Sequence, residues 1–97
     1  MGKMTFVWDD RKAEQNLKKH KVSFEEASTV FFDENAIEFF DPDHSADEDR
    51  FLMLGVSCQL RLLVVSYCFR REGKQIRIIS ARRATTKERK AYIRGNQ

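Results

Sequence analysis

The sequence contains little proline, glycine or cysteine. Its 97 residues include one Pro, four Gly and two Cys, and they contain no repeat, no low-complexity tract and no linker-like stretch. Linkers and disordered segments are usually rich in proline, glycine and serine. A chain of this length also leaves no room for two hydrophobic cores. We therefore expect one domain over residues 1–97.

Long hydrophobic runs are also missing. The longest apolar run is Leu62–Val65, far short of the roughly 20 residues that cross a membrane as a helix. The first residues, "MGKMTFVWDD", lack the apolar core of a secretory signal. We therefore expect a cytoplasmic protein that does not contact membranes. Cys58 and Cys68 should stay reduced, because about 3.3 Å per extended residue holds them too far apart for a disulfide.

The sequence has only two histidines and none of the common metal or nucleotide motifs. Neither His20 nor His44 has the spacing of a metal-ligand pair. The acidic stretch Asp41–Asp49 lacks the central glycine and the terminal glutamate of a calcium loop, so we interpret it as a solvated loop. There is no glycine-rich phosphate loop and no nucleophile elbow. These absences argue against NTPases and serine hydrolases, and we expect no cofactor.

Positive charge is absent from the middle of the chain. Between Val22 and Asp49 there are ten acidic residues and no Lys or Arg. Residues 1–60 carry seven basic and thirteen acidic side chains, whereas residues 61–97 carry eleven basic and two acidic ones. This asymmetry favours a basic face for a polyanion, with an acidic edge that orients it. The alternative is an ordinary solvated surface with an uneven order of charges.

Hydrophobic periodicity and turn residues predict an α+β fold with the order β-α-α-β-β-β-β-α. The expected strands are Met4–Trp8, Ala36–Phe40, Arg50–Ser57, Leu60–Arg71 and Gln75–Arg82, and the expected helices are Asp9–His20, Ser23–Phe32 and Thr85–Arg94. We expect an antiparallel sheet with the two N-terminal helices on one face. The C-terminal helix should pack against an edge or an end of the sheet.

Two of the expected helices begin with a capping-box pattern. Ser23 and Glu26 match the S-x-x-E pattern, and Thr85 and Glu88 match its threonine form. In a capping box each side chain accepts a hydrogen bond from the backbone N–H of the other residue. The patterns therefore predict that both glutamates bond to the starts of their own helices.

Alternation along the last strand predicts which face each side chain occupies. Ile76, Ile78 and Arg82 should share one face, and Arg77 should lie on the other. An arginine costs little on a sheet face that is open to water. Strict alternation therefore separates Arg77 from Arg82.

The remaining chemistry is basic, aromatic and hydroxyl, which suits RNA binding. It also suits RNA cleavage without a metal, in which the 2′-hydroxyl attacks the neighbouring phosphate. That reaction needs a proton acceptor, cations near the developing charge and a proton donor. No single residue is decisive, because each has an ordinary alternative. His20 suits the end of its helix, Tyr92 suits packing, and His44 suits a local hydrogen bond.

Four segments resemble the BrnT toxins of bacterial type II toxin–antitoxin modules. They are "FVWDDRKAEQNLKKHKVSFEEASTVFFD", "DPDHSADEDRFLMLGVS", "RLLVVSYCFR" and "IRIISARRATTKERKAY". The likeness runs from Phe6 to Tyr92 with the same order and spacing. The resemblance implies a RelE-like fold and a ribonuclease that arrests translation. It also implies a BrnA-like antitoxin with a DNA-binding domain, so that DNA is contacted only through the complex that represses the operon.

The sequence departs from the family pattern at two positions. Lys21 stands after the Lys-His pair, where family members often have glycine. The stretch "SCQLR", Ser57–Arg61, lacks a glycine that often occurs in that turn. The second departure affects the shape of the turn and with it the direction of Arg61.

Our leading hypothesis is a metal-independent endoribonuclease toxin. Arg77 and Arg82 would hold the phosphate and stabilise the charged intermediate, and Arg61 would position the RNA. His20 is the first candidate for proton transfer, followed by Tyr92 and Glu48. Further RNA-binding candidates are Arg70, Arg83, Lys87 and Lys90. The hypothesis requires these cations to converge in one groove. The alternative is a non-catalytic module that binds RNA or the antitoxin and takes part in operon autoregulation.

Overall fold

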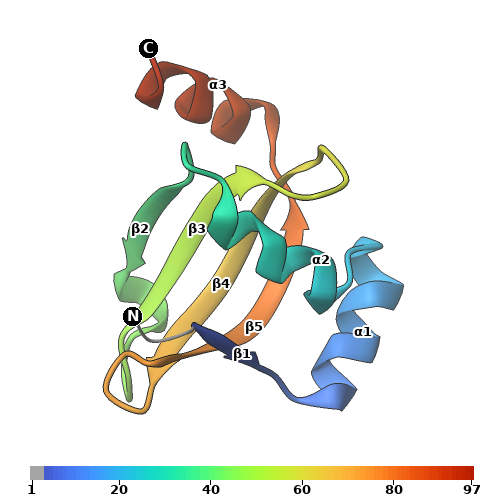
Figure 1. The fold of residues 1–97 in the computed structure, drawn as a ribbon, viewed down its shortest axis with the longest axis vertical. Coiled ribbons are helices and arrows are strands. Elements are labelled where there is room, and N and C mark those ends of the chain that lie inside the picture. The colour runs from blue at the N-terminus through green and yellow to red at the C-terminus, as the bar shows by residue number, and fades with distance from the viewer. Residues whose placement is uncertain (1–3) are drawn as a thin grey trace.

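The structure, a computed structural model, describes residues 4–97 as a five-stranded sheet with three α-helices (Figure 1). The elements in chain order are β1 (Thr5–Val7), α1 (Asp10–His20), α2 (Phe24–Thr29), the 3-10 helix η1 (Val30–Phe32), β2 (Ile37–Asp41), the 3-10 helix η2 (Pro42–His44), β3 (Arg50–Val56), β4 (Leu62–Arg70), β5 (Gln75–Arg83) and α3 (Thr86–Gly95). The expected α+β class is confirmed. The sequence did not predict the two short 3-10 helices.

The sheet is mixed, with the strand order β1-β5-β4-β3-β2. Strands β2 to β5 pair antiparallel, but β1 pairs parallel to β5, from Thr5 opposite Gln75 to Val7 opposite Arg77. The expected fully antiparallel sheet is therefore wrong at this edge. Short hairpins force antiparallel pairing, whereas a strand separated from its partner by helices pairs in either direction.

Helix α2 covers one face of the sheet, whereas α1 lies beside the edge of β5, so the prediction that both helices cover this face is confirmed for α2 alone (Figure 1). Phe24 and Ala27 of α2 are fully buried there, because their spacing places them on the same side of the helix. The buried members of this core are Val22, Phe24, Ala27, Val30, Leu63, Val65, Tyr67, Ile76, Ile78 and Ala81. The opposite face of β3, β4 and β5 is therefore left without α1 and α2, and we call it the open face.

Helix α3 stands beyond one end of the sheet (Figure 1). Its Tyr92 packs on a second, smaller core that contains the buried residues Leu54, Leu62 and Val64. These residues belong to the open face, so α3 closes one end of that face. The predicted position of the C-terminal helix is confirmed.

A β-bulge changes which face of the sheet the side chains of β5 occupy. Ser66 pairs with Ser80, but the next residue of β4, Tyr67, pairs with Ile78, so Ile79 is an extra residue. Before the bulge Arg77 alternates with the buried Ile78, and after it Arg82 pairs with Val64 of the second core. Both arginines therefore lie on the open face. The prediction that alternation separates them is wrong, because strict alternation assumes that no bulge interrupts the strand.

The two departures from the family pattern both fall at positions of positive φ. Lys21 has φ 60° and closes α1, and its backbone N–H donates to the Leu17 carbonyl at 3.0 Å. Leu60 has φ 59° in the turn between β3 and β4. A non-glycine residue in this region costs about 1–2 kcal/mol. The chain thus keeps backbone turns that favour glycine, although it has no glycine there.

Both cysteines are free thiols, as predicted. Cys58 is exposed in the turn after β3, and Cys68 is buried in β4. Within residues 4–97, no helix has the length and apolar character that crossing a membrane requires.

Candidate RNA-binding and active site

The open face carries cations and hydroxyls from adjacent strands. Arg77, Ser80 and Arg82 come from β5, and Ser66 and Cys68 come from β4. Ser66 lies opposite Ser80, and Cys68 lies opposite Arg77. Both arginines are partly exposed. This face combines positive charge with hydrogen-bond donors, which is the chemistry that binds phosphate.

Arg82 is held by a carboxylate of α3. Its Nη1 and Nη2 each donate to one carboxylate oxygen of Glu88 at 2.8 Å. The Thr85 backbone N–H donates to Glu88 Oε1 at 2.8 Å, and Thr85 Oγ1 accepts from the Glu88 N–H at 3.2 Å, so the predicted capping box is confirmed. The hydrogen bonds from Arg82 lower the pKa of Glu88 to about 2, against the effect of burial.

Arg61 lies on the helix-bearing side and is held by Glu26. Its Nε donates to Glu26 Oε2 at 2.9 Å, its Nη2 donates to Glu26 Oε1 and, at 3.0 Å, to the Lys21 carbonyl. The Ser57 hydroxyl donates to the same carboxylate at 2.6 Å. Glu26 is only 3% exposed. The Arg61 hydrogen bonds lower the pKa of Glu26 although burial opposes them.

The first predicted capping box is therefore only half formed. Ser23 Oγ accepts from the Glu26 backbone N–H at 3.0 Å, but the Glu26 carboxylate binds Arg61 and Ser57 instead of the Ser23 N–H. A guanidinium group provides a stronger, charge-assisted hydrogen bond than a backbone amide does. Arg61 thus links α2 and the end of α1 to the turn between β3 and β4.

Tyr92 is fixed by Asp33. Its hydroxyl donates to Asp33 Oδ2 at 2.7 Å, and the same oxygen accepts from the Val56 backbone N–H at 2.8 Å. Burial, together with the Asp33 charge, raises the pKa of Tyr92 to about 12. The hydroxyl joins α3 to the segment after η1.

The end of the open face opposite α3 holds Glu48. Glu48 Oε1 accepts from Arg70 Nη2 at 3.3 Å and from Cys68 Sγ at 3.4 Å. Burial, followed by the Glu48 contact, raises the pKa of the Cys68 thiol. His44 makes the local contact that the sequence suggested, with Nδ1 at 2.9 Å from Asp41 Oδ2.

His20 lies in a cleft between α1 and β5. The cleft has a volume of about 190 Å³ and is lined by Lys12, Gln15, Asn16, Lys19, His20, Ile79 and Ser80. We call it the basic cleft. His20 was predicted from the sequence as a site residue, whereas Lys12 and Lys19 were not. Their helical spacing from Asn16 and His20, with residues three, four and seven apart on one side of α1, was the available signal.

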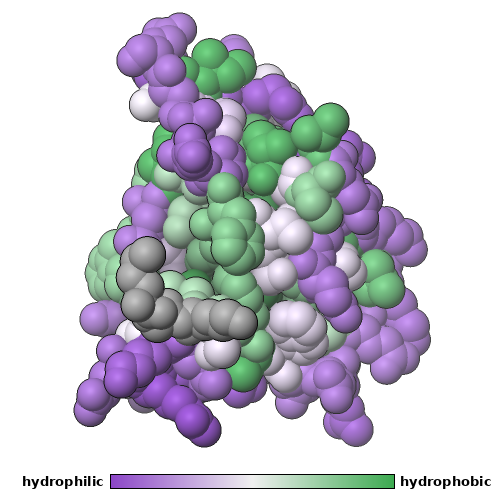
Figure 2. All heavy atoms as spheres, in the orientation of Figure 1, coloured by the Kyte–Doolittle hydropathy of each residue, from purple (hydrophilic) through white to green (hydrophobic). Residues whose placement is uncertain are grey.

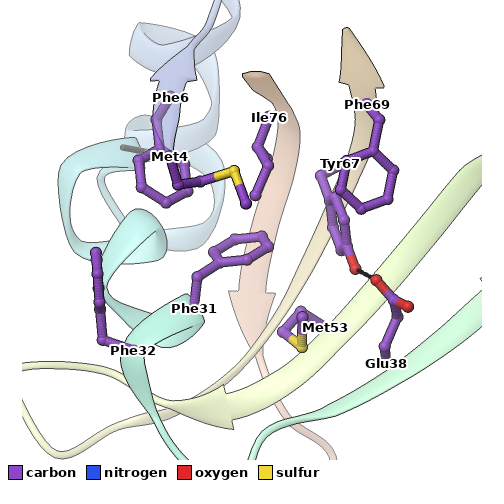
Figure 3. A pocket seen from close by; sticks show the side chains of 9 residues that line it. All are labelled: Met4, Phe6, Phe31, Phe32, Glu38, Met53, Tyr67, Phe69 and Ile76. Atoms are coloured by element: carbon purple, nitrogen blue, oxygen red, sulfur yellow. Dashed lines mark hydrogen bonds between the residues drawn. The ribbon is translucent and has the colours of Figure 1, made fainter. Parts of the chain in front are cut away.

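An apolar hollow lies on the helix-bearing side of the sheet, beside η1 (Figure 3). It has a volume of about 280 Å³ and is lined by Met4, Phe6, Phe31, Phe32, Glu38, Met53, Tyr67, Phe69 and Ile76. Tyr67 donates its hydroxyl to the Glu38 carboxylate, and burial with that contact raises the pKa of Tyr67. Figure 2 shows hydrophobic residues across the middle of this side of the molecule. The described lining residues include no cation, so this hollow does not suit a phosphate.

A family model described as the ribonuclease toxin BrnT of type II toxin–antitoxin systems matches residues 8–88. The chain belongs to the BrnT family. The crystal structure of the ribonuclease toxin BrnT from Brucella abortus is similar in fold, with a TM-score of 0.67 and 23% sequence identity over 87% of this chain and 100% of that chain. No curated protein matches the chain. Membership of a type II toxin family implies an antitoxin partner and an RNA target.

The predicted site residues of this BrnT-family protein do not all meet in one groove. Arg77, Arg82, Arg70 and Glu48 belong to the open face and its far end, whereas His20 lies in the basic cleft. On the helix-bearing side are Arg61 and Arg83, and Lys87 and Lys90 are exposed on α3. The Ser80 side chain connects two of these regions, since it lines the basic cleft and pairs with Ser66 on the open face.

Proposed function

We propose that this BrnT-family ribonuclease cleaves RNA internally and without a metal ion. The 2′-hydroxyl of a ribose would attack the adjacent phosphate, and the 5′-oxygen of the next nucleotide would leave with a proton. The observation that carries the proposal is the bulge at Ile79, which places Arg77 and Arg82 on one open face. Two guanidinium groups there supply the positive charge that the pentacoordinate phosphate requires.

The two arginines have different surroundings. Among residues 4–97, Arg77 has no ion pair, so its guanidinium is available for a phosphate. Glu88 aligns Arg82 by accepting from Nη1 and Nη2. The Nε–H of Arg82 is not used in this pair. An aligned arginine loses little side-chain entropy when it binds a phosphate. We assign phosphate binding to Arg77 and stabilisation of the charged intermediate to both.

For proton transfer we place His20 before Tyr92 and Glu48. An imidazole can both accept and donate a proton, which the attack and the departure of the leaving oxygen each require. The Tyr92 hydroxyl already donates to Asp33, and Glu48 already binds Arg70. His20 and Ser80 both line the basic cleft, and Ser80 pairs with Ser66 of the open face.

RNA incubated with purified protein in the presence of EDTA tests the proposal. We expect cleavage to persist, and we expect Arg77→Ala to lower kcat/KM by about 100-fold, as the loss of one electrostatic donor does. Arg71→Ala, in the exposed turn after β4, is the matched control and should leave kcat/KM unchanged. Cleavage that stops with EDTA and returns with added Mg²⁺ would contradict metal independence.

We also propose that the RNase acts in the cytoplasm, inhibits translation and is neutralised by a BrnA-like antitoxin with a DNA-binding domain. We propose RelE-like as its wider fold family. The basic open face supports an antitoxin with an acidic, amphipathic segment that orders on binding and covers this face. Adding the product of the neighbouring gene to the cleavage assay should suppress cleavage. Undiminished cleavage at saturating partner would argue against this neutralisation.

A second candidate is a non-catalytic module that binds RNA or the antitoxin and contributes to operon autoregulation. The hydrogen bonds of Arg61, Arg82 and Tyr92 within the fold favour it, because they occupy groups that a catalytic site would need. The same assay separates the two functions. Wild-type protein that retains RNA at high concentration but yields no cleaved product would support the second candidate.

A further inference from the structure

The basic cleft has a structural cause at the edge of the sheet. Strand β1 pairs only with Gln75–Arg77, so the edge of β5 beyond Arg77 lacks a strand partner. Helix α1 lies beside this edge (Figure 1). Asn16 takes the place of a strand residue, because its Nδ2 donates to the Ala81 carbonyl at 2.8 Å and its Oδ1 accepts from the Ala81 N–H at 3.1 Å.

This contact positions one side of α1 toward the bulge of β5. Asn16 Nδ2 also donates to the Val22 carbonyl at 3.0 Å, and Asn16 is buried, so the helix cannot rotate without breaking three hydrogen bonds. Lys12 and Lys19 lie four residues before and three residues after Asn16 and therefore share its side of the helix. The hollow between them and Ser80 is the basic cleft.

We propose that the basic cleft is an RNA-backbone site, in which Lys12 and Lys19 bind phosphates and the strand continues past Ser80 onto the open face. This proposal rests on the proposed function and names the path of its substrate. Seven residues of helix separate the two lysines by about 10 Å. They therefore contact different phosphates of one strand.

The charges around the cleft favour the binding of an anion. Within the described part of the chain, Lys12 and Lys19 have no ion pair, whereas Arg61, Arg70 and Arg82 are paired with glutamates. None of the cleft-lining residues that the structure describes carries a carboxylate. Two acids near the cleft have other partners: Glu14 of α1 pairs with Lys18 at 3.4 Å, and Asp9, the residue before the helix, accepts from the Lys12 backbone N–H at 3.0 Å.

Asp9 also shows that Arg77 lies near the start of α1. The pKa of Asp9 is lowered mainly by its hydrogen bond from the Lys12 N–H, and the positive charge of Arg77 contributes. The pairing of Val7 with Arg77 agrees with this placement, and the Asp9 carboxylate lies near both Lys12 and Arg77. Ser80, which lines the cleft and pairs with Ser66 of the open face, joins the two regions.

The cleft suits a backbone rather than a free small molecule or a base. Its volume of about 190 Å³ is below the roughly 300 Å³ at which small-molecule pockets usually begin. Its lining residues include Gln15 and Ser80 but, among residues 4–97, no Phe, Tyr or Trp on which a base would stack. Binding should therefore depend on salt and little on RNA sequence.

A non-cleavable ligand tests this site separately from catalysis. A short single-stranded 2′-O-methyl RNA keeps the phosphates but lacks the attacking hydroxyl. Its binding to wild type and to Lys12→Ala/Lys19→Ala is measured by fluorescence anisotropy over a series of salt concentrations. We expect the double variant to bind roughly tenfold more weakly, with a log–log salt slope smaller by about 1.4, as the loss of two phosphate contacts predicts.

The matched control is Arg11→Ala/Lys18→Ala. It removes two cations with the same seven-residue spacing from the same helix, but neither residue lines the cleft. We expect its affinity and salt slope to stay close to those of wild type. Lys12→Arg/Lys19→Arg should restore both quantities, and far-UV circular dichroism should show the same fold for every variant.

The outcomes separate this inference from the proposed function. If the wild type cleaves RNA but the cleft variant binds and cleaves like the wild type, the inference is overturned and the proposed function stands. An equal loss in the control variant also overturns it, since the effect would then come from net charge. A wild type that neither binds nor cleaves RNA overturns both.

Discussion

At the scale of single residues, the charge of Glu26 depends on Arg61. Glu26 is 3% exposed, and Arg61 provides two of its hydrogen bonds. Arg61→Ala leaves this carboxylate buried without a counter-charge, and we expect it to lower the free energy of unfolding by about 3 kcal/mol. Urea denaturation measures the change.

Arg70→Ala is the control, because it removes the same kind of side chain from an exposed pair. Arg70 and Glu48 have side chains that are 43% and 37% exposed, and such pairs contribute less than about 1 kcal/mol. Equal losses of stability in the two variants would contradict the structural role of Arg61. RNA binding by Arg61→Ala must therefore be measured below the melting temperature of that variant, so that a loss of binding does not come from unfolding.

The sequence suggested which arginines could bind RNA, but it did not indicate which of them form ion pairs within the fold. Arg61 binds a glutamate 35 positions earlier in the chain, and no local pattern indicates a contact of that range. By contrast, the Thr85–Glu88 capping box is local and was predicted correctly. Lys12 and Lys19 were missed because a helix surface rich in lysine usually faces only water, and the unpaired edge of β5 was not foreseen.

At the scale of elements, two side-chain hydrogen bonds attach the second half of α3 and its C-cap to the rest of the fold, in addition to the Arg82–Glu88 pair at its start. Asn96 Nδ2 donates to the Asn35 carbonyl at 3.1 Å, and the Tyr92 hydroxyl donates to Asp33 at 2.7 Å. A Cβ atom at Gly95 would lie 2.6 Å from Ile37 Cδ1, so the helix end approaches β2 closely. Tyr92 is therefore the polar group that joins the middle of α3 to the segment after η1.

We expect Tyr92→Phe to loosen α3 without affecting cleavage. The ring still packs on the second core, but the hydrogen bond to Asp33 is lost, at a cost of about 1 kcal/mol. Hydrogen exchange should show faster exchange of the α3 amides than in wild type. A drop in kcat by about 100-fold or more, the size expected for a lost proton donor, would instead support a catalytic role for Tyr92.

Elements defined by local signals were predicted well, whereas their pairing was not. The alternation in β4 and the capping residues of α1 and α3 indicated these elements almost to their observed bounds. The parallel pairing of β1 and the bulge at Ile79 depend on how strands meet across the sheet. The bulge decides the candidate site, since it places Arg77 and Arg82 on the same face of the sheet.

At the scale of the whole molecule, three carboxylates join elements to one another. Glu26 joins α2 to the turn after β3, Asp33 joins the segment after η1 to β3 and α3, and Glu88 joins α3 to β5. Hydrogen bonds lower the pKa of each below its ordinary value, although burial opposes the shift and is the largest single influence on Asp33. Glu88 reaches a pKa of about 2. Protonation of these groups therefore weakens the fold.

We expect the free energy of unfolding to fall between about pH 5 and pH 2. A group whose pKa is lower in the folded state stabilises the fold above its unfolded pKa, near 4.3 for glutamate, and loses this effect as the pH falls through the folded value. Repulsion among the 18 Lys and Arg side chains acts in the same direction once the carboxylates are neutral. Urea denaturation at a series of pH values from 2 to 7 measures the slope. Glu88→Gln should flatten this slope as the pH approaches 2, where Glu88 takes up its proton. A stability that rises on acidification would contradict these anchoring roles.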